Sequence, residues 1–260
     1  MTTISDRVAL ITGASRGIGA AIARALAAKG CRLALQYRAN RGAAEIVAAS
    51  LAGARHTLHA ADLGRLGGAE SLWNDVVREV GHVDILVNNA GVYFHHAPFE
   101  VDLATWRSAW RETLDTNLLA PAELSYLAAR KMAAQPAADP LFGRGRIVNI
   151  SSRGAFRGEP DGPAYGASKA GLNALSQSLA KAAADRGVYV YAIAPGWVAT
   201  DMAAEHLRGP DGADIIAQHP LGRVTTPEEV ADAVVFCALN APAAMTGAIL
   251  DVNGASYLRT

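Results

Sequence analysis

The sequence contains few cysteines and no excess of charge of either sign. Its 260 residues include two cysteines, Cys31 and Cys237, too few for a disulfide framework. We expect both to be reduced thiols in apolar surroundings, as in a cytoplasmic protein. The 24 Lys and Arg residues equal the 24 Asp and Glu residues in number, so the net charge is zero. A neutral chain has no field to attract nucleic acid or an anionic membrane, and we expect neither as a partner.

Long hydrophobic runs are also absent. No stretch of about 18 uncharged apolar residues occurs, so no transmembrane helix is predicted. The opening residues MTTISDR lack the apolar stretch and the cleavage site of a signal peptide. Both absences favour a cytoplasmic globular protein.

Apolar side chains and glycine are abundant. Hydrophobic residues make up 51% of the chain and charged residues 18%, a balance that argues against disorder. The 25 glycines make up about a tenth of the 260 residues, above the average share of about 7%. No linker, charge block or repeat marks a boundary, so we expect one domain over residues 1–260.

Short apolar runs alternate with longer helix-like stretches along the chain. This alternation predicts an α/β fold, with a doubly wound parallel sheet and helices on both of its faces. The expected strands are Val8–Thr12, Arg32–Tyr37, Leu58–Ala61, Val83–Asn88, Arg146–Ser151, Val188–Ala194 and Ala248–Val252. The expected helices are Ala20–Lys29, Ala43–Leu51, Ala69–Val80 and Ala164–Asp185, with two more on either side of Asn117.

Two segments interrupt this alternation. Gln135–Gly145 has the proline and glycine content of a loop. The stretch Ala203–Pro227 is polar and holds three prolines. We expect a substrate lid at about residues 201–226, with an ordered excursion of the chain as the alternative.

A glycine-rich turn follows the first expected strand. Its sequence, Thr12-Gly13-Ala14-Ser15-Arg16-Gly17-Ile18-Gly19, has the glycine spacing G-x-x-x-G-x-G. Such a turn lets the backbone approach a pyrophosphate, which then faces the free N–H groups and positive dipole end of the next helix. Strand, turn and helix in this order predict a Rossmann-type dinucleotide site.

The end of the second expected strand distinguishes NADP(H) from NAD(H). An NAD site usually has an acidic residue there to bind the ribose 2′-hydroxyl, but Gln36–Arg41 contains none. Arg38, assisted by Arg16, could instead bind a 2′-phosphate through its planar guanidinium. The alternative is that both arginines are solvated surface charges. We therefore favour NADP(H) over NAD(H).

A tyrosine and a lysine lie four residues apart in an expected helix. Tyr165 and Lys169 would project from one face of that helix. A nearby ammonium and a positively charged nicotinamide would both favour the phenolate, so that Tyr165 could exchange a proton near neutral pH. Ser151 and Ser152 end the strand upstream, where a hydroxyl can bond a substrate carbonyl. They could also be ordinary turn serines.

In these motifs the chain resembles the short-chain dehydrogenase/reductase family, over almost its whole length. It is most similar to the compact branch that includes the 3-oxoacyl reductases. The turn Thr12–Gly19 matches the family's cofactor loop, and Asn88-Asn89-Ala90-Gly91 matches the element that closes the fourth strand beside the adenosine ribose. Val252-Asn253-Gly254 resembles the final strand ending, with Asn where the family often has Asp.

The resemblance implies the catalytic residues and their roles. Asn117 matches the active-site asparagine, and Ser152 matches the catalytic serine because it lies thirteen positions before Tyr165. Ser152 would polarise the carbonyl oxygen and Tyr165 would protonate it. Lys169 would hold the nicotinamide ribose and lower the pKa of Tyr165, and Asn117 would support a water that resupplies protons. The hydride chemistry belongs to the cofactor.

The cofactor contacts implied by the resemblance extend over the first four fifths of the chain. They include the glycine turn, the adenine edge at Asp62-Leu63 and the nicotinamide segment that begins at Pro195-Gly196. The full set is Gly13, Ser15, Arg16, Gly17, Ile18, Gly19, Tyr37, Arg38, Asp62, Leu63, Asn89, Ala90, Gly91, Tyr165, Lys169, Pro195, Gly196, Val198 and Thr200.

Several other polar and aromatic residues have competing interpretations. His95 and His96 lack companions at metal-ligand spacing, so no metal site is expected. His95, Tyr93 and Phe94 instead line the substrate mouth or lie on the surface. Trp197 is a candidate for the pocket or for the core. Arg153 and Arg157 could meet an anionic substrate. Arg130, Lys131 and Lys181 could meet an acidic carrier protein, but solvated helix faces explain them more simply.

These observations predict an NADP(H)-dependent oxidoreductase that acts on a small-molecule carbonyl or secondary alcohol. One alternative is a 3-oxoacyl thioester reductase, although the loop Gln135–Gly145 departs from the compact pattern of those enzymes. The other is a non-catalytic dinucleotide-binding redox sensor, which the complete catalytic set disfavours. By resemblance we expect a homo-oligomer, a tetramer or a dimer, formed through the two long central helices around Asn117–Ala134 and Ala164–Asp185. The apolar residues of these helices could equally face the sheet as core.

Overall fold

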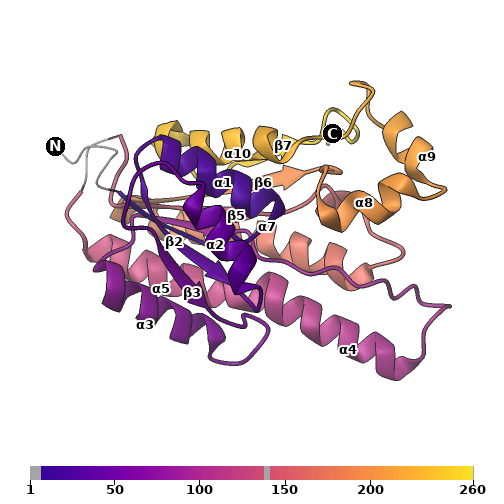
Figure 1. The fold of residues 1–260 in the computed structure, drawn as a ribbon, viewed down its shortest axis with the longest axis horizontal. Helices are drawn as coiled ribbons and strands as arrows, with labels where there is room; N and C mark the ends of the chain where they lie inside the picture. Colours follow the sequence, from indigo (N-terminus) through magenta and orange to yellow (C-terminus); the bar gives the residue numbers. More distant parts are fainter. Residues whose placement is uncertain (1–6, 138–140, 260) are drawn as a thin grey trace.

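The computed structural model describes residues 7–137 and 141–259, which form a layered α/β structure around one parallel sheet (Figure 1). The sheet has seven strands in the order β3-β2-β1-β4-β5-β6-β7, and every neighbouring pair is parallel. The predicted fold class is therefore confirmed. The strands are β1 (Val8–Ile11), β2 (Arg32–Tyr37), β3 (Thr57–Ala60), β4 (Ile85–Asn88), β5 (Gly145–Ile150), β6 (Val188–Pro195) and β7 (Ile249–Val252).

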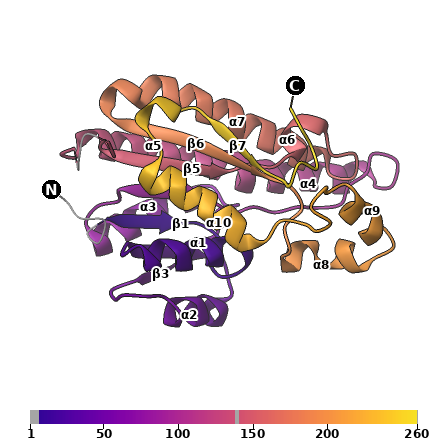
Figure 2. The same ribbon diagram turned by 90° about the horizontal axis from the view of Figure 1, so that it is seen from above.

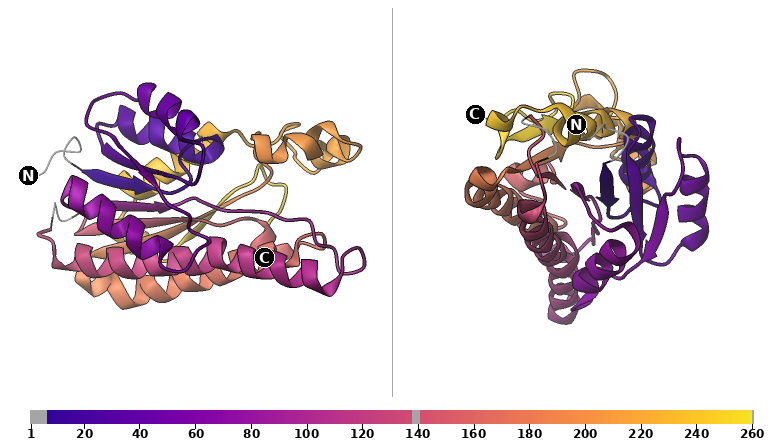
Figure 3. Two further views of the ribbon diagram at one scale, coloured as in Figure 1. Left: turned by 60° about the horizontal axis from the view of Figure 1, so that its bottom comes forward. Right: turned by 90° about the vertical axis from the view of Figure 1, so that its left-hand side faces the viewer.

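Helices cover both faces of this sheet, as Figures 2 and 3 show. On one face α1 (Gly17–Ala28), α2 (Arg41–Ala49) and α10 (Pro227–Val235) pack over one hydrophobic cluster. On the other face α3 (Gly68–Val80), α5 (Ala120–Ala134) and α7 (Pro163–Ala183) pack over a second cluster. The remaining helices are α4 (Leu103–Leu114), α6 (Gly154–Arg157), α8 (Asp201–Arg208) and α9 (Gly212–Ala217).

The strands are apolar because both faces of the sheet are covered. Ile85, Leu86 and Val87 of β4 are fully buried, and so are the central residues of β1 and β6. Cys31 and Cys237 are free and buried in the first cluster, as predicted. Burial raises the pKa of the two thiols to about 11 and about 12, respectively.

The predicted elements agree closely with the observed ones. β2 has the predicted ends, and the other predicted strands differ by one or two residues at either end. Helix α10 was not predicted, although Thr226 and Glu229 form a capping box at its start, a pattern readable in the sequence. Residues 138–140 of the predicted loop Gln135–Gly145 lie outside the described residues.

The expected lid segment contains two helices. In Figures 1 and 3, α8 and α9 extend beyond the end of the sheet in orange. The chain leaves and returns at one short parallel bridge, where Ala199 N donates to Thr225 O at 2.9 Å and Thr225 N donates to Trp197 O at 3.0 Å. The segment is therefore an ordered excursion in this structure, and its movement as a lid stays a prediction.

No helix among the described residues combines the length and apolarity needed to cross a membrane. The seven strands lie in one sheet, whereas the expectation of one domain over residues 1–260 extends to residues that are not described and stays a prediction.

Candidate active site

The glycine turn is fixed to the end of β4 by a set of hydrogen bonds. The Thr12 Oγ1 accepts from the backbone N–H groups of Asn89 and Ala90 at 2.9 and 3.0 Å. The Asn89 side chain donates to the carbonyl oxygens of Thr12 and Gly13 at 2.9 and 3.1 Å. The ends of two neighbouring strands are thereby held together, and Gly91 follows directly.

The turn itself requires glycine at particular positions. Gly13 and Gly17 have φ values of +64° and +53°, in the left-handed region that favours glycine. A Cβ on Gly19 would collide with the carbonyl oxygen of Gly13 and the Asn89 side chain. The loop thus brings its backbone close to the N-terminus of α1, which begins at Gly17 without a side-chain cap. Its free N–H groups suit a phosphate.

Gln36 supports the glycine turn from β2, a role that the sequence analysis missed. Its Oε1 accepts from the Gly13 N–H at 2.7 Å, and its Nε2 donates to the Ala61 carbonyl at 2.7 Å. The sequence does place this polar residue within an apolar strand, which could have indicated a buried hydrogen-bonding role, and Gln36 is indeed buried.

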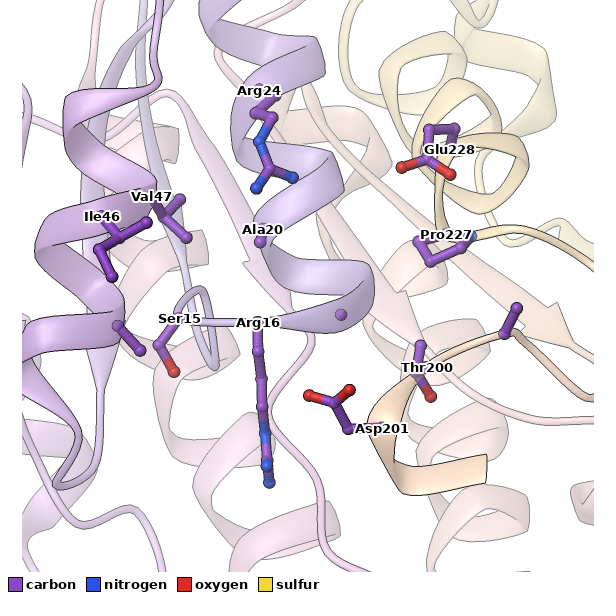
Figure 4. A pocket seen from close by; sticks show the side chains of 13 residues that line it. Ser15, Arg16, Ala20, Arg24, Ile46, Val47, Thr200, Asp201, Pro227 and Glu228 are labelled. Atoms are coloured by element: carbon purple, nitrogen blue, oxygen red, sulfur yellow. The ribbon is translucent and has the colours of Figure 1, made fainter. Parts of the chain in front are cut away.

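The two predicted phosphate-binding arginines are exposed at the expected place. Within the described part of the chain, neither Arg16 nor Arg38 forms an ion pair. Arg16 lies in a groove of about 380 Å³ whose rim includes Ser15, Thr200 and Asp201 (Figure 4). Arg38 directly follows the buried Tyr37 at the end of β2. Both guanidinium groups are therefore free to bind an anion.

The predicted adenine edge lies at the end of β3. Asp62 is exposed and accepts a hydrogen bond from the Gly64 N–H at 3.0 Å, whereas the Leu63 side chain is buried. The predicted contact of these residues with adenine stays a prediction.

Beyond β6 the chain turns back toward the glycine turn. Gly196 N donates to Val252 O at 3.1 Å, and a Cβ at Gly196 would lie 2.9 Å from the Asn253 Cβ. Thr200 reaches the glycine turn, since a Cβ on Gly17 would lie 3.3 Å from its methyl group. Thr200 therefore lies opposite the start of α1, and the contacts of Pro195, Gly196 and Val198 with a cofactor stay predictions.

Helix α7 and the loop after β5 bring Ser152 and Tyr165 together. The Ser152 Oγ accepts from the Gly154 N–H at 3.0 Å, and its hydroxyl is near enough to the Tyr165 phenol to act on the pKa of that group. Ser151 points elsewhere, with its hydroxyl donating to the Lys169 carbonyl oxygen at 3.3 Å. Of the two serines, only Ser152 is placed beside the tyrosine.

The environment of the tyrosine and lysine shifts both of their pKa values. Burial raises the pKa of Tyr165, and the hydrogen bond from Ser152 acts in the lowering direction. The Lys169 Nζ donates to the Ile150 carbonyl oxygen at 2.8 Å, and burial lowers its pKa to about 8. The ammonium lies 5.7 Å from the centre of the Tyr165 ring. Among the groups of the protein itself, burial therefore outweighs the lowering that was expected from Lys169, and the pKa of Tyr165 is raised.

Asn117 lies in a π-helical turn, Asp115–Leu119, between α4 and α5. Such single π turns occur often at functional sites. The Asn117 side chain is fully buried, accepts from Val92 N at 2.8 Å and donates to Val92 O at 2.9 Å. A Cβ on Gly91 would lie 3.4 Å from Asn117 Oδ1 and 3.5 Å from Lys169 Nζ. Asn117, Gly91 and Lys169 therefore meet at one point.

A series of aromatic contacts leads from Tyr165 to Trp197. Tyr93 packs edge-on against Tyr165 with ring centres 5.5 Å apart. His206 of α8 lies 6.5 Å from Tyr93 and 5.4 Å from Trp197, so its ring bridges the two. Trp197 is thus part of the site rather than of the core. His206 was not predicted, because no motif marks it.

The structure disagrees with the anionic-substrate interpretation of two arginines. Arg153 is buried and donates to Ser256 Oγ at 2.7 Å and to Gln218 Oε1 at 3.0 Å. Arg157 pairs with Glu159 at 3.7 Å. Arg153 binds the C-terminal segment and the residue that follows α9, whereas Arg157 is exposed and pairs with a carboxylate of its own loop.

The two adjacent histidines have different surroundings. His95 is exposed and pairs with Glu100 at 2.8 Å. His96 is fully buried and hydrogen-bonds to Phe94 and Ala164. Across residues 7–137 and 141–259, no three His, Cys, Asp or Glu side chains are grouped to hold a metal ion.

Comparison with known proteins agrees with this geometry. A family model described as enoyl-(acyl carrier protein) reductase matches residues 13–255. The 3-oxoacyl-(acyl-carrier-protein) reductase FabG of Escherichia coli (strain K12) is 36% identical over 252 residues, which cover 97% of this chain and 98% of the relative. The cis-4-hydroxycyclohexanecarboxylate dehydrogenase of Sinomonas cyclohexanicum is 37% identical over 253 residues, 96% of each chain.

Solved structures match over the same extent. A short chain dehydrogenase of Burkholderia cenocepacia J2315 in complex with NADP has a TM-score of 0.86 at 30% identity, with 98% of this chain and 99% of that chain covered. A protein of Beutenbergia cavernae with NADP bound at low occupancy has a TM-score of 0.84 at 36% identity and 96% coverage of each chain.

The fold, the site and these relatives define a dinucleotide-dependent oxidoreductase. The chain belongs to the short-chain dehydrogenase/reductase family, as the sequence predicts, and acts on an alcohol or its carbonyl counterpart. The prediction of NADP(H) agrees with the nucleotide bound in both solved neighbours.

Proposed function

We propose that this protein is an NADP(H)-dependent carbonyl reductase, or secondary alcohol dehydrogenase in the reverse direction, with Ser152, Tyr165 and Lys169 as its catalytic residues. One observation carries the proposal: Ser152, Tyr165 and Lys169 lie together, with the Ser152 hydroxyl near enough to act on the pKa of Tyr165 and the buried Lys169 ammonium 5.7 Å from the centre of the Tyr165 ring. A proton donor, an oxygen-binding hydroxyl and a fixed positive charge suit the reduction of a carbonyl.

The residues present fit NADP(H). The glycine turn and the N-terminus of α1 would bind the pyrophosphate. Arg16 and Arg38, which have no carboxylate partner among the described residues, would bind the 2′-phosphate. Lys169 would hold the nicotinamide ribose. The bound cofactor supplies hydride to the carbonyl carbon in the reductive direction. The remaining predicted contacts would complete the same cofactor site, and Ser15 and Thr200 line the groove beside Arg16.

The chain's own residues would handle the proton. Ser152 donates a hydrogen bond to the substrate oxygen, and Tyr165 gives this oxygen its proton as the alcohol forms. The positive charges of Lys169 and of an oxidised nicotinamide favour the phenolate that remains. The Asn117 side chain already forms hydrogen bonds with the backbone of Val92. A water that carries protons would therefore be bound by the backbone of the π turn.

Replacement of the tyrosine tests this assignment. Tyr165→Phe removes the proton donor and keeps the ring, so we expect turnover with a panel of ketones and 3-oxo esters to fall at least a hundredfold. NADPH consumption measures the rate. Tyr189→Phe, near the start of β6 and so at the opposite end of that strand from Pro195, is the matched control and should be unchanged. Full activity of Tyr165→Phe would refute the assigned role.

A second candidate function is reduction of 3-oxoacyl thioesters. The similarity to the Escherichia coli 3-oxoacyl-(acyl-carrier-protein) reductase favours it. Comparing turnover of 3-oxoacyl thioesters on acyl carrier protein, on coenzyme A and as simple esters would distinguish the two functions. A strong preference for the carrier-bound substrate supports the second.

We further propose a cytoplasmic homo-oligomer, a tetramer or dimer, with one domain and α8 and α9 as a substrate lid. Two free buried thiols suit a reducing compartment. Leu119 and Tyr126, exposed on the central helical stretch, suit a contact between subunits. Light scattering would measure the number of chains.

A further inference from the structure

Helix α7 begins without a side-chain cap although it carries the Tyr165–Lys169 pair. Its N-cap residue is Gly162, which has no side chain, and its first residue is Pro163, which has no N–H group. The first backbone donor of the helix is therefore Ala164, one residue before Tyr165. The first N–H groups of a helix have no partner within it and need an acceptor from elsewhere.

His96 supplies that acceptor from a distant part of the chain. Its Nε2 accepts a hydrogen bond from the Ala164 N–H at 3.2 Å. Its Nδ1 donates to the Phe94 carbonyl oxygen at 2.8 Å, because a carbonyl can only accept. The two contacts fix the neutral tautomer with its proton on Nδ1. In a third hydrogen bond, the backbone N–H of His96 donates to the Asp161 carbonyl oxygen at 2.8 Å.

The imidazole is held firmly in this position. It is fully buried, and Trp106 of α4 packs against it at 5.4 Å between ring centres, with the planes at 64°. The same short segment contacts Tyr165 directly through Tyr93. The segment after β4 is thus fixed against the first turn of α7 at two points, the backbone of Ala164 and the ring of Tyr165.

We propose that His96 is a positioning residue for the proton donor. By holding the first turn of α7, its ring fixes the Tyr165 hydroxyl relative to Ser152. A displacement of about 1 Å at a reacting group can cost about a hundredfold in rate. The inference rests on the proposed function, in which Tyr165 protonates the substrate oxygen.

The test compares variants that keep or lose the acceptor. His96→Gln keeps an acceptor near the position of Nε2 and a donor for Phe94, whereas His96→Leu and His96→Asn do not place an acceptor there. His95→Gln, at the exposed neighbour, is the matched control. Each variant is assayed with NADPH and the most active ketone or 3-oxo ester of a panel that includes ethyl acetoacetate.

We expect His96→Leu and His96→Asn to lower kcat about ten- to a hundredfold. The NADPH dissociation constant should change less than twofold, because His96 does not touch the proposed cofactor cleft. The solvent isotope effect on kcat should increase, because transfer of the Tyr165 proton becomes slower relative to the other steps. His96→Gln should recover most of the activity.

Several results would overturn the inference. Wild-type kcat in His96→Leu, or His96→Gln as impaired as His96→Leu, would show that the acceptor does not matter. If His96→Leu does not fold, the His96→Asn and His96→Gln pair makes the same comparison, and failure of both His96→Leu and His96→Asn to fold would make His96 a stability residue. Full activity of Tyr165→Phe would instead remove the proposed function itself.

Discussion

At the scale of single residues, the sequence indicated which side chains meet but not all of their partners. Tyr165 and Lys169 could be predicted to share a helix face because the helical repeat fixes this. Gln36 and His96 could not be found in this way, since their partners, Gly13 and Ala164, are backbone groups distant in the chain. Such contacts depend on tertiary packing, which no local pattern encodes.

Cofactor preference depends on residues at this scale. Arg38→Ala removes a guanidinium that would bind the 2′-phosphate, so we predict that KM for NADPH rises about ten- to a hundredfold, as expected for one charged hydrogen bond. KM for NADH should stay within twofold, because NADH has no 2′-phosphate. Initial rates with both cofactors measure this. An equal rise for NADH would contradict the assignment.

Lys169 makes stability depend on pH. Burial lowers its pKa from 10.5 to about 8, so between these values the unfolded chain binds the proton that the folded chain has lost. As the pH rises over that range, Lys169 therefore increases the free energy of unfolding by up to about 1.4 kcal/mol per pH unit. Other groups titrate there, so the wild type is compared with Lys169→Met by urea denaturation from pH 7 to 10. Parallel curves would contradict the shifted pKa.

At the scale of elements, the parallel strands and their helices could be predicted because buried strands are continuous apolar runs. The π turn at Asp115–Leu119 could not, since it depends on how α4 and α5 pack around Val92. The lid helices also escaped prediction. Their polar sequence has too few buried apolar residues to show a helical periodicity. The position of α8 depends instead on contacts of His206 with the rings of Tyr93 and Trp197.

The position of α8 leads to a prediction about substrate size. His206 bridges Trp197 and Tyr93, and Tyr93 packs against Tyr165, so we expect this bridge to narrow the approach of a long chain to Tyr165. His206→Ala should raise kcat/KM for long 3-oxoacyl thioesters several-fold relative to short ketones. A series of increasing chain length measures the ratio, with Glu205→Ala on the same helix as control. No change in the ratio would contradict this role of α8.

At the scale of the whole molecule, one sheet brings the ends of β1, β4, β5 and β6 to the same edge. We infer that Gly13, Asn117 and Thr200, which are distant in the sequence, serve one cofactor cleft at that edge, as the order of motifs predicts. The substrate could not be predicted, because the fold leaves specificity to the lid and to the rings around Tyr165.

Transfer of deuterium tests the central claim, hydride transfer between NADP(H) and a carbonyl, most directly. The wild-type protein is incubated with NADPH deuterated at the transferable position of C4 and a panel of ketones and 3-oxo esters, and the products are analysed by mass spectrometry. We predict one deuterium on the former carbonyl carbon of at least one product, with one NADPH consumed per alcohol formed. Alcohol without deuterium, or no NADPH consumption with any substrate, would contradict the account.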